Sequence, residues 1–63
     1  MNELKLNCEL AIKHLTTKDF IAFNFRLSEI WKIMLSPIYT IEINKKAELC
    51  YCELTELLEA VND

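Results

Sequence analysis

The sequence predicts an all-α fold: a helix-turn-helix hairpin followed by a C-terminal helix, each of the three helices short and amphipathic. Three observations support this fold class. Apolar residues recur at helical spacing in three separate segments, glycine is absent while proline occurs once, and apolar residues make up 52% of the chain. Such a composition is too apolar for a disordered chain. A length of 63 residues leaves room for a single helical domain, residues 1–63.

The first predicted helix lies near the N-terminus. Its apolar residues follow the spacing that places side chains on one face of an α-helix. These residues are Leu4, Cys8, Ala11, Ile12 and Leu15.

The second predicted helix begins after a capping sequence and ends before a proline. We expect Thr16 to be its N-cap, with Asp19 reaching back to complete a capping box and Leu15 packing on Phe20 as a hydrophobic staple. The helix should run to about Leu35, because the residue before a proline is pushed out of the α region. Its main stripe is Phe20, Phe23, Leu27, Ile30, Trp31 and Met34.

Asn24 also falls within this stripe. There it either fixes the register of helix packing, as a buried asparagine does in coiled coils, or lies at the edge of the stripe.

The third predicted helix starts somewhere between Thr40 and Asn44. Residues 38–43 alternate imperfectly, as a strand would, but a lone strand has no partner in so short a chain. We therefore expect a turn that leads into the helix. Its stripe is Ala47, Cys50, Leu54, Leu57, Leu58 and Val61, and its glutamates lie off the stripe.

The cysteines do not form a metal clip. Cys50 and Cys52 stand about 200° apart around a helix axis, so they cannot chelate one ion together. Cys8, His14 and Cys50 lack the paired spacing of a zinc site. We expect three free thiols, because an odd count gives no closed disulfide framework and the cytosol is reducing.

Charge and motifs exclude several function classes. A net charge of −3 argues against a phosphate backbone as the main ligand and favours a basic protein partner. No nucleophile motif or Gly-rich phosphate loop is present, so we expect no enzyme and no cofactor. No apolar run is long enough to cross a membrane, and Glu3 and Glu9 stand where a signal peptide would be basic and then apolar. We therefore expect a cytoplasmic protein.

The helices carry more apolar residues than one stripe each can use. Leu6, Leu10, Ile21, Phe25, Ile33 and Leu49 all lie off the main stripes. Burying each such side chain fully contributes roughly 2 kcal/mol to stability. If all six stay exposed to solvent, a stabilisation on the order of 10 kcal/mol is lost. We expect an interface, either with a partner or in a homodimer, and we assign to it Leu10, Ile21, Phe25, Ile33 and Leu49. The alternative is a compact monomer that buries its second helix on two sides.

The order of residues from Leu10 to Cys50 resembles a known family. It contains Leu10-Ala11, then Phe20, then Trp31 followed by Met34-Leu35, and finally Lys46-Ala47-Glu48-Leu49-Cys50. This order is similar to that of the AraC negative regulators of Gram-negative pathogens and phages, which have a Leu-Ala pair, an aromatic residue, W-x-x-A-L and a closing R-A-E-F-C. Here Lys46 replaces the arginine, Leu49 the phenylalanine and Met34 a small residue.

The resemblance implies a negative regulator of virulence-gene transcription. Such a protein binds an AraC-type activator and blocks its dimerisation or DNA binding, and some members engage nucleoid proteins of the H-NS type. The motif residues that we expect in the core are Ala11, Phe20, Trp31, Leu35, Ala47 and Cys50. For Trp31 the alternative is an aromatic anchor that contacts the partner.

Two other function classes remain open. A small secretion chaperone or subunit-capping adaptor would share the acidity and the paired helices, but would bind an exported protein. A DNA-binding helix-turn-helix would need a basic recognition helix, and the second helix, with Glu29 between Arg26 and Lys32, suits that role poorly. We expect no direct nucleic acid binding.

Overall fold

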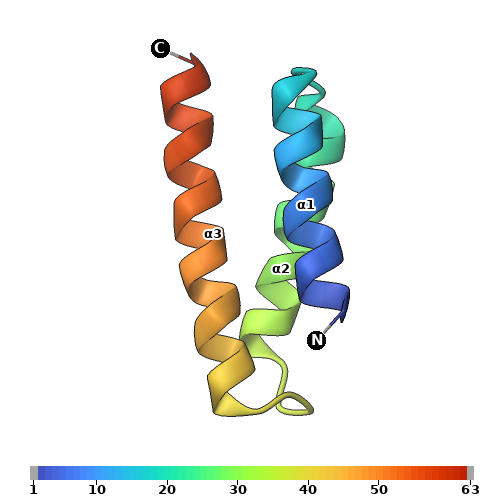
Figure 1. The fold of residues 1–63 in the computed structure, drawn as a ribbon. Coiled ribbons are helices and arrows are strands. Elements are labelled where there is room, and N and C mark those ends of the chain that lie inside the picture. The colour runs from blue at the N-terminus through green and yellow to red at the C-terminus, as the bar shows by residue number, and fades with distance from the viewer. Residues whose placement is uncertain (1, 63) are drawn as a thin grey trace.

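The computed structural model describes residues 2–62 and contains three α-helices. They are α1 (Asn2–Thr16), α2 (Phe20–Leu35) and α3 (Ile41–Asn62). Helices α1 and α3 run in the same direction and α2 runs against them (Figure 1). No strand occurs among residues 2–62, so the predicted all-α fold is confirmed. The alternating segment 38–43 forms a turn and the first residues of α3.

The turn between α1 and α2 is a Schellman motif built without glycine. The Asp19 amide donates to the His14 carbonyl at 2.8 Å, and the Lys18 amide donates to the Leu15 carbonyl at 3.1 Å. Lys18 takes the left-handed conformation, with φ 59°, that glycine usually supplies. A left-handed L-residue costs about 1–2 kcal/mol, so the bonds of the motif must offset that strain.

The N-cap of α2 is Asp19, and the prediction of Thr16 is wrong. A carboxylate oxygen of Asp19 accepts from the Ala22 amide at 3.2 Å. The Thr16 hydroxyl instead donates to the Ile12 carbonyl at 2.9 Å, which places Thr16 in the last turn of α1. The Schellman motif that ends α1 includes the residues up to Asp19. The next helix therefore begins only at Phe20.

The turn between α2 and α3 matches the predicted boundaries. Helix α2 ends at Leu35, before Ser36 and Pro37, and α3 begins at Ile41. The Thr40 hydroxyl accepts from the Ile43 amide at 3.2 Å, which caps α3. The Asn44 side-chain amide donates to the Ile33 and Ser36 carbonyls, at 2.8 and 3.2 Å. Asn44 thereby ties the start of α3 to the end of α2.

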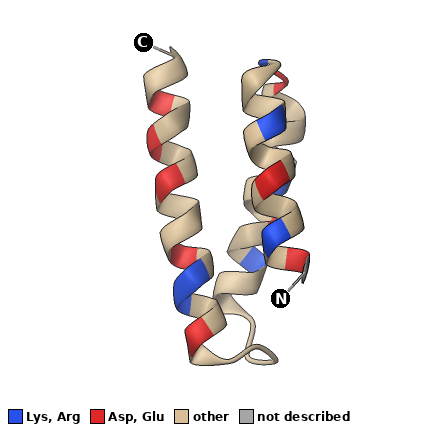
Figure 2. Ribbon diagram, in the orientation of Figure 1, with Lys and Arg blue, Asp and Glu red and all other residues tan. Residues whose placement is uncertain are grey.

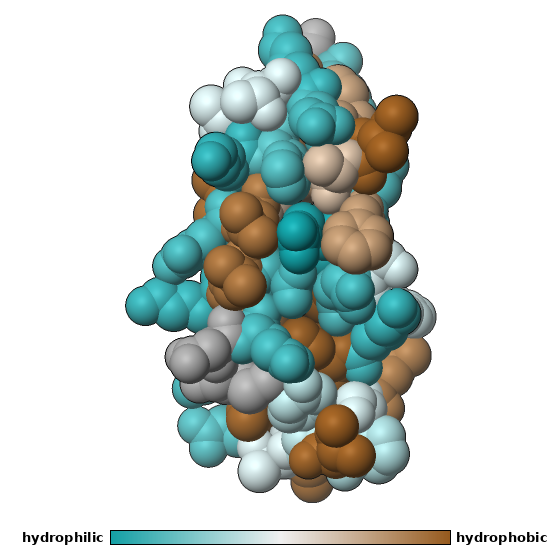
Figure 3. Space-filling view, turned by 90° about the vertical axis from the view of Figure 1, so that its right-hand side faces the viewer, coloured by the Kyte–Doolittle hydropathy of each residue, from teal (hydrophilic) through white to brown (hydrophobic). Residues whose placement is uncertain are grey.

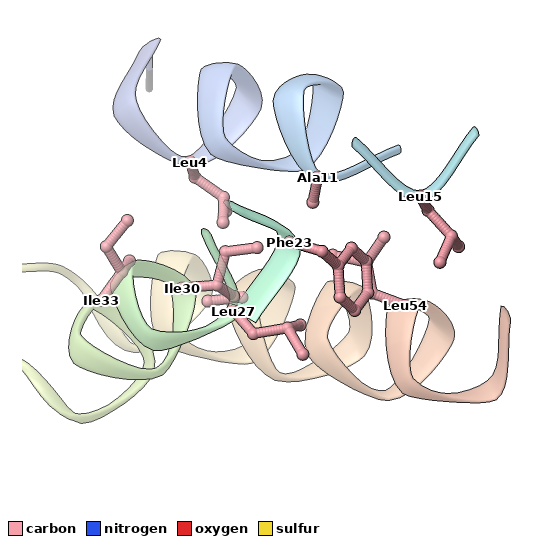
Figure 4. Close-up of a cluster of buried hydrophobic side chains, with 9 residues drawn as sticks. Leu4, Ala11, Leu15, Phe23, Leu27, Ile30, Ile33 and Leu54 are labelled. Atoms are coloured by element: carbon pink, nitrogen blue, oxygen red, sulfur yellow. The ribbon is translucent and has the colours of Figure 1, made fainter. Parts of the chain in front are cut away.

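The core lies along α2, between the other two helices. Its buried side chains are Leu4, Ala11 and Leu15 from α1, Phe23, Leu27, Ile30 and Ile33 from α2, and Ala47 and Leu54 from α3 (Figure 4). Phe23 and Ile30 are fully buried. Because α2 is covered from two sides, it contributes more buried residues than either neighbour.

Because α1 and α3 both cover α2, the residues that are buried on α2 differ from those of its predicted stripe. Ile33, predicted to lie off the stripe, is only 5% exposed, whereas Trp31, predicted within it, is 46% exposed. Asn24 is exposed, so the alternative in which it lies at the edge of the stripe is the correct one. On the other helices, Ile12, Leu57 and Val61 belong to predicted stripes and remain exposed.

Phe23 and Phe25 form a matched pair for testing this core. Replacement Phe23→Ala empties a fully buried site and should lower the free energy of unfolding by about 3 kcal/mol or more. Replacement Phe25→Ala, at a side chain that is 54% exposed, should change it by less than about 1 kcal/mol. Urea denaturation followed by circular dichroism measures both values, and equal losses would contradict the assignment.

A second pair of variants tests which residue is the N-cap of α2. Replacement Asp19→Ala removes the acceptor of the Ala22 amide and should lower the free energy of unfolding by about 1 kcal/mol. Thr16→Ala removes only a hydroxyl bond inside α1 and should cost less. The same denaturation experiment ranks the two variants, and a larger loss at Thr16 would restore the predicted cap.

Candidate protein-binding surfaces

The surface of the protein is rich in large apolar side chains. Eleven of those described are at least 40% exposed. They are Leu6, Ile12, Ile21, Phe25, Trp31, Leu35, Ile38, Ile41, Leu49, Leu57 and Val61. The face in Figure 3 shows such groups in separate clusters with hydrophilic atoms between them. Clusters of exposed apolar side chains are candidate contact sites for other proteins.

The residues predicted to form an interface do not make one patch. Ile21 and Phe25 lie one turn apart on α2, with 88% and 54% of their surface exposed. Leu10 is half-buried on α1. Leu49 is exposed on α3, two residues from the buried Ala47, so it points away from the shared core.

Ile33 must be removed from the predicted interface. It lines the core at 5% exposure because α2 packs against both neighbours. A side chain that is already covered has almost no surface left for a partner.

The motif residues predicted to be core divide into two groups. Ala11 and Ala47 are fully buried, and Phe20 and Cys50 pack against the core while partly exposed. Trp31 and Leu35 are instead 46% and 63% exposed, so their core assignment is wrong. Leu35 is the last residue of α2, and Trp31 lies beside the buried arc of that helix.

Trp31 forms an aromatic pair with Tyr51 of α3. The ring centroids are 5.4 Å apart, with the planes tilted by 55°. One side of the indole is thereby held against α3 while nearly half of the residue stays in contact with solvent. An aromatic ring that is already fixed loses little entropy on binding, and tryptophan and tyrosine are the residue types that contribute most often to interface energy.

A cleft of about 410 Å³ separates parts of α1 and α2. Within it the Arg26 guanidinium donates to the Asn7 side-chain oxygen at 3.0 Å and lies 5.1 Å from the centroid of the Phe25 ring. The Nε of Arg26 is buried and has no hydrogen-bond partner. The Tyr39 hydroxyl donates to Glu3 at 2.5 Å, which attaches the α2–α3 turn to α1. These contacts join neighbouring helices, so we assign the cleft a structural role.

Two of the three cysteines are paired, which corrects the prediction of three free thiols. Cys8 of α1 and Cys50 of α3 form a disulfide, with 6.9 Å between their Cα atoms. The pair is 42 residues apart in the chain and meets because α1 and α3 run in the same direction. Cys52 is free and exposed, so Cys50 and Cys52 do point to different sides.

Within residues 2–62, no three His, Cys, Asp or Glu side chains lie close enough to hold a metal ion. None of the three described helices combines the length and the apolar character that a membrane span requires.

Comparison with protein-family models, with curated proteins and with solved structures finds no significant match.

The Tyr39–Glu3 contact predicts a measurable pH dependence. The hydrogen bond to Glu3 raises the pKa of Tyr39 above its ordinary 10.0, because the carboxylate accepts only from the protonated phenol. The stabilisation is therefore fully present below pH 10 and is lost as the pH rises through the pKa of the folded protein.

Titration of the Tyr39 ring by NMR should give a midpoint above 10.0, and Glu3→Ala should lower that midpoint. Glu9→Ala on the same helix is the control and should leave it unchanged. An unchanged midpoint in Glu3→Ala would show that the contact does not form in solution.

Proposed function

We propose that this protein is a negative regulator of virulence-gene transcription that binds an AraC-type activator and blocks its dimerisation or DNA binding. The observation that carries the proposal is the exposure of eleven large apolar side chains among residues 2–62, because such side chains are suited to contact with a protein partner. The resemblance of residues Leu10–Cys50 to the AraC negative regulators supports the choice of partner. A nucleoid protein of the H-NS type is a second partner that the resemblance suggests.

The inhibitor would act by occlusion rather than by chemistry. Helices that associate through apolar side chains lose their interface when another helical protein covers it. Trp31 and Phe25 are suitable anchors, because both are aromatic, both are about half exposed and each is held by a neighbour, Tyr51 and Arg26 respectively. The negative charge of the protein disfavours direct competition for the DNA backbone.

In the absence of the activator we expect the amphipathic helices to form a cytoplasmic homodimer that covers part of the same surface. A domain of this size gains a large share of its stability from such association. Binding the activator and binding a second copy would then compete for the exposed side chains on α2 and α3.

A capture experiment tests the proposal. The tagged protein should retain an AraC-type activator, and the double replacement Phe25→Ala/Trp31→Ala should weaken binding at least about tenfold, because two aromatic anchors are lost. Ser28→Ala is the control, since it changes an exposed polar residue on the same helix. Circular dichroism confirms that each variant remains folded.

Two outcomes would contradict the proposal. Undiminished binding by the folded double variant would exclude the two aromatic residues as anchors. Capture of an exported protein from the native host, with no capture of the activator, would favour a secretion chaperone or capping adaptor instead.

A further inference from the structure

The side of the protein where α1 faces α3 contains an apolar strip that is about half exposed. Cys8 and Cys50 point at each other across this side, since they form a disulfide. Ile12 follows Cys8 by one helical turn, and Leu57 and Val61 follow Cys50 by two and three turns, so all three continue along the same side. We call Ile12, Leu57 and Val61 the α1–α3 seam.

The seam is open because α2 does not fill it. Ile12, Leu57 and Val61 are 50%, 46% and 40% exposed. In Figure 1, α2 begins behind α1, and its Phe23 reaches the core between α1 and α3 while the seam residues stay about half exposed. Ile12 lies in the second half of α1, and Leu57 and Val61 lie in the second half of α3.

On the α3 side of the seam the charged residues are acidic. After Lys46, every charged residue in the described part of α3 is a glutamate: Glu48, Glu53, Glu56 and Glu59 (Figure 2). The ion pairs found among residues 2–62 join Lys32 to Glu29 and Lys46 to Glu42, so none of these four carboxylates is paired. No basic residue occupies the last turn of α3, where the helix dipole is itself negative.

We propose that the α1–α3 seam binds an amphipathic helix of the partner whose apolar stripe is flanked by lysine or arginine. The apolar stripe covers Ile12, Leu57 and Val61 as a fourth helix of a bundle would, and the basic flank faces Glu53, the glutamate of α3 that lies beside the seam. This inference deepens the proposed function, on which it rests, by assigning the chemistry of the activator's helix and its place on this protein.

Matched charge changes on α3 test the side on which the helix binds. Around the axis of α3, Glu53 lies about 60° from the direction of Cys50 and Glu59 about 180° from it. Glu53→Lys therefore puts a positive charge beside the seam, and Glu59→Lys puts the same charge on the opposite flank. At physiological salt the screening length of about 8 Å keeps the two positions distinct.

The probe is a synthetic peptide of about 18 leucine and lysine residues at helical spacing, long enough for a bound helix. Two control peptides have the shuffled sequence and glutamate in place of lysine. In calorimetric titration, Glu53→Lys should weaken binding of the leucine–lysine peptide about fivefold and Glu59→Lys less than about twofold. Leu57→Ala should weaken it about tenfold, while Ile38→Ala, an exposed site in the turn between α2 and α3, should leave it unchanged.

NMR of the wild-type protein locates the peptide directly. Shifts confined to the amides around Ile12, Leu57 and Val61 support the inference. The inference is overturned by equal weakening in the two lysine variants, by equal binding of the shuffled or glutamate peptide, by shifts centred on Phe25, or by absence of binding.

The activator itself, tested on the same variants, separates this inference from the proposed function. Capture that is lost in Glu53→Lys and Leu57→Ala supports both. Capture that is unaffected by these variants overturns the inference and leaves the function standing. Peptide binding at the seam without capture of the activator overturns the function and retains the seam as a site for a basic helix.

Discussion

The packing of α2 against both of its neighbours is the constraint on which the rest of the structure depends. Phe23 and Ile30 are fully buried between α1 and α3, and no other helix is covered from two sides to this extent. A chain of this size has few residues with which to build a core, so one central helix must serve two contacts. That arrangement leaves the outer sides of all three helices, and the side between α1 and α3, to solvent.

Contacts at the helix ends complement this small core. The Schellman motif around Lys18 and the Asn44 bonds to Ile33 and Ser36 set the direction in which the chain leaves each helix. The Cys8–Cys50 disulfide joins the first helix to the last. Such links hold the three helices in a fixed arrangement, and the exposed side chains are presented from that arrangement. Preorganised side chains bind partners at a lower entropic cost.

The exposed apolar residues point in several directions, which bears on how a partner is held. Ile21 and Phe25 lie on the outer side of α2, Trp31 stands beside α3, and Leu57 faces the seam. One flat contact cannot cover all of them. Glu53, about 60° from the direction of Cys50 around the axis of α3, places a negative charge beside the seam.

Local sequence by itself determined the number of helices, the end of α2 before Pro37 and the opposite directions of Cys50 and Cys52. The first follows from apolar periodicity, the second from the geometry of proline and the third from the helical repeat, and each of these acts over only a few residues. Tertiary structure alone decided that Ile33 is buried and Trp31 exposed, since a helical stripe does not reveal how many neighbours will cover it. It also decided the pairing of Cys8 with Cys50 and the open seam beyond them. Both depend on the direction in which α3 returns along α1, and that direction results from packing between segments far apart in the chain.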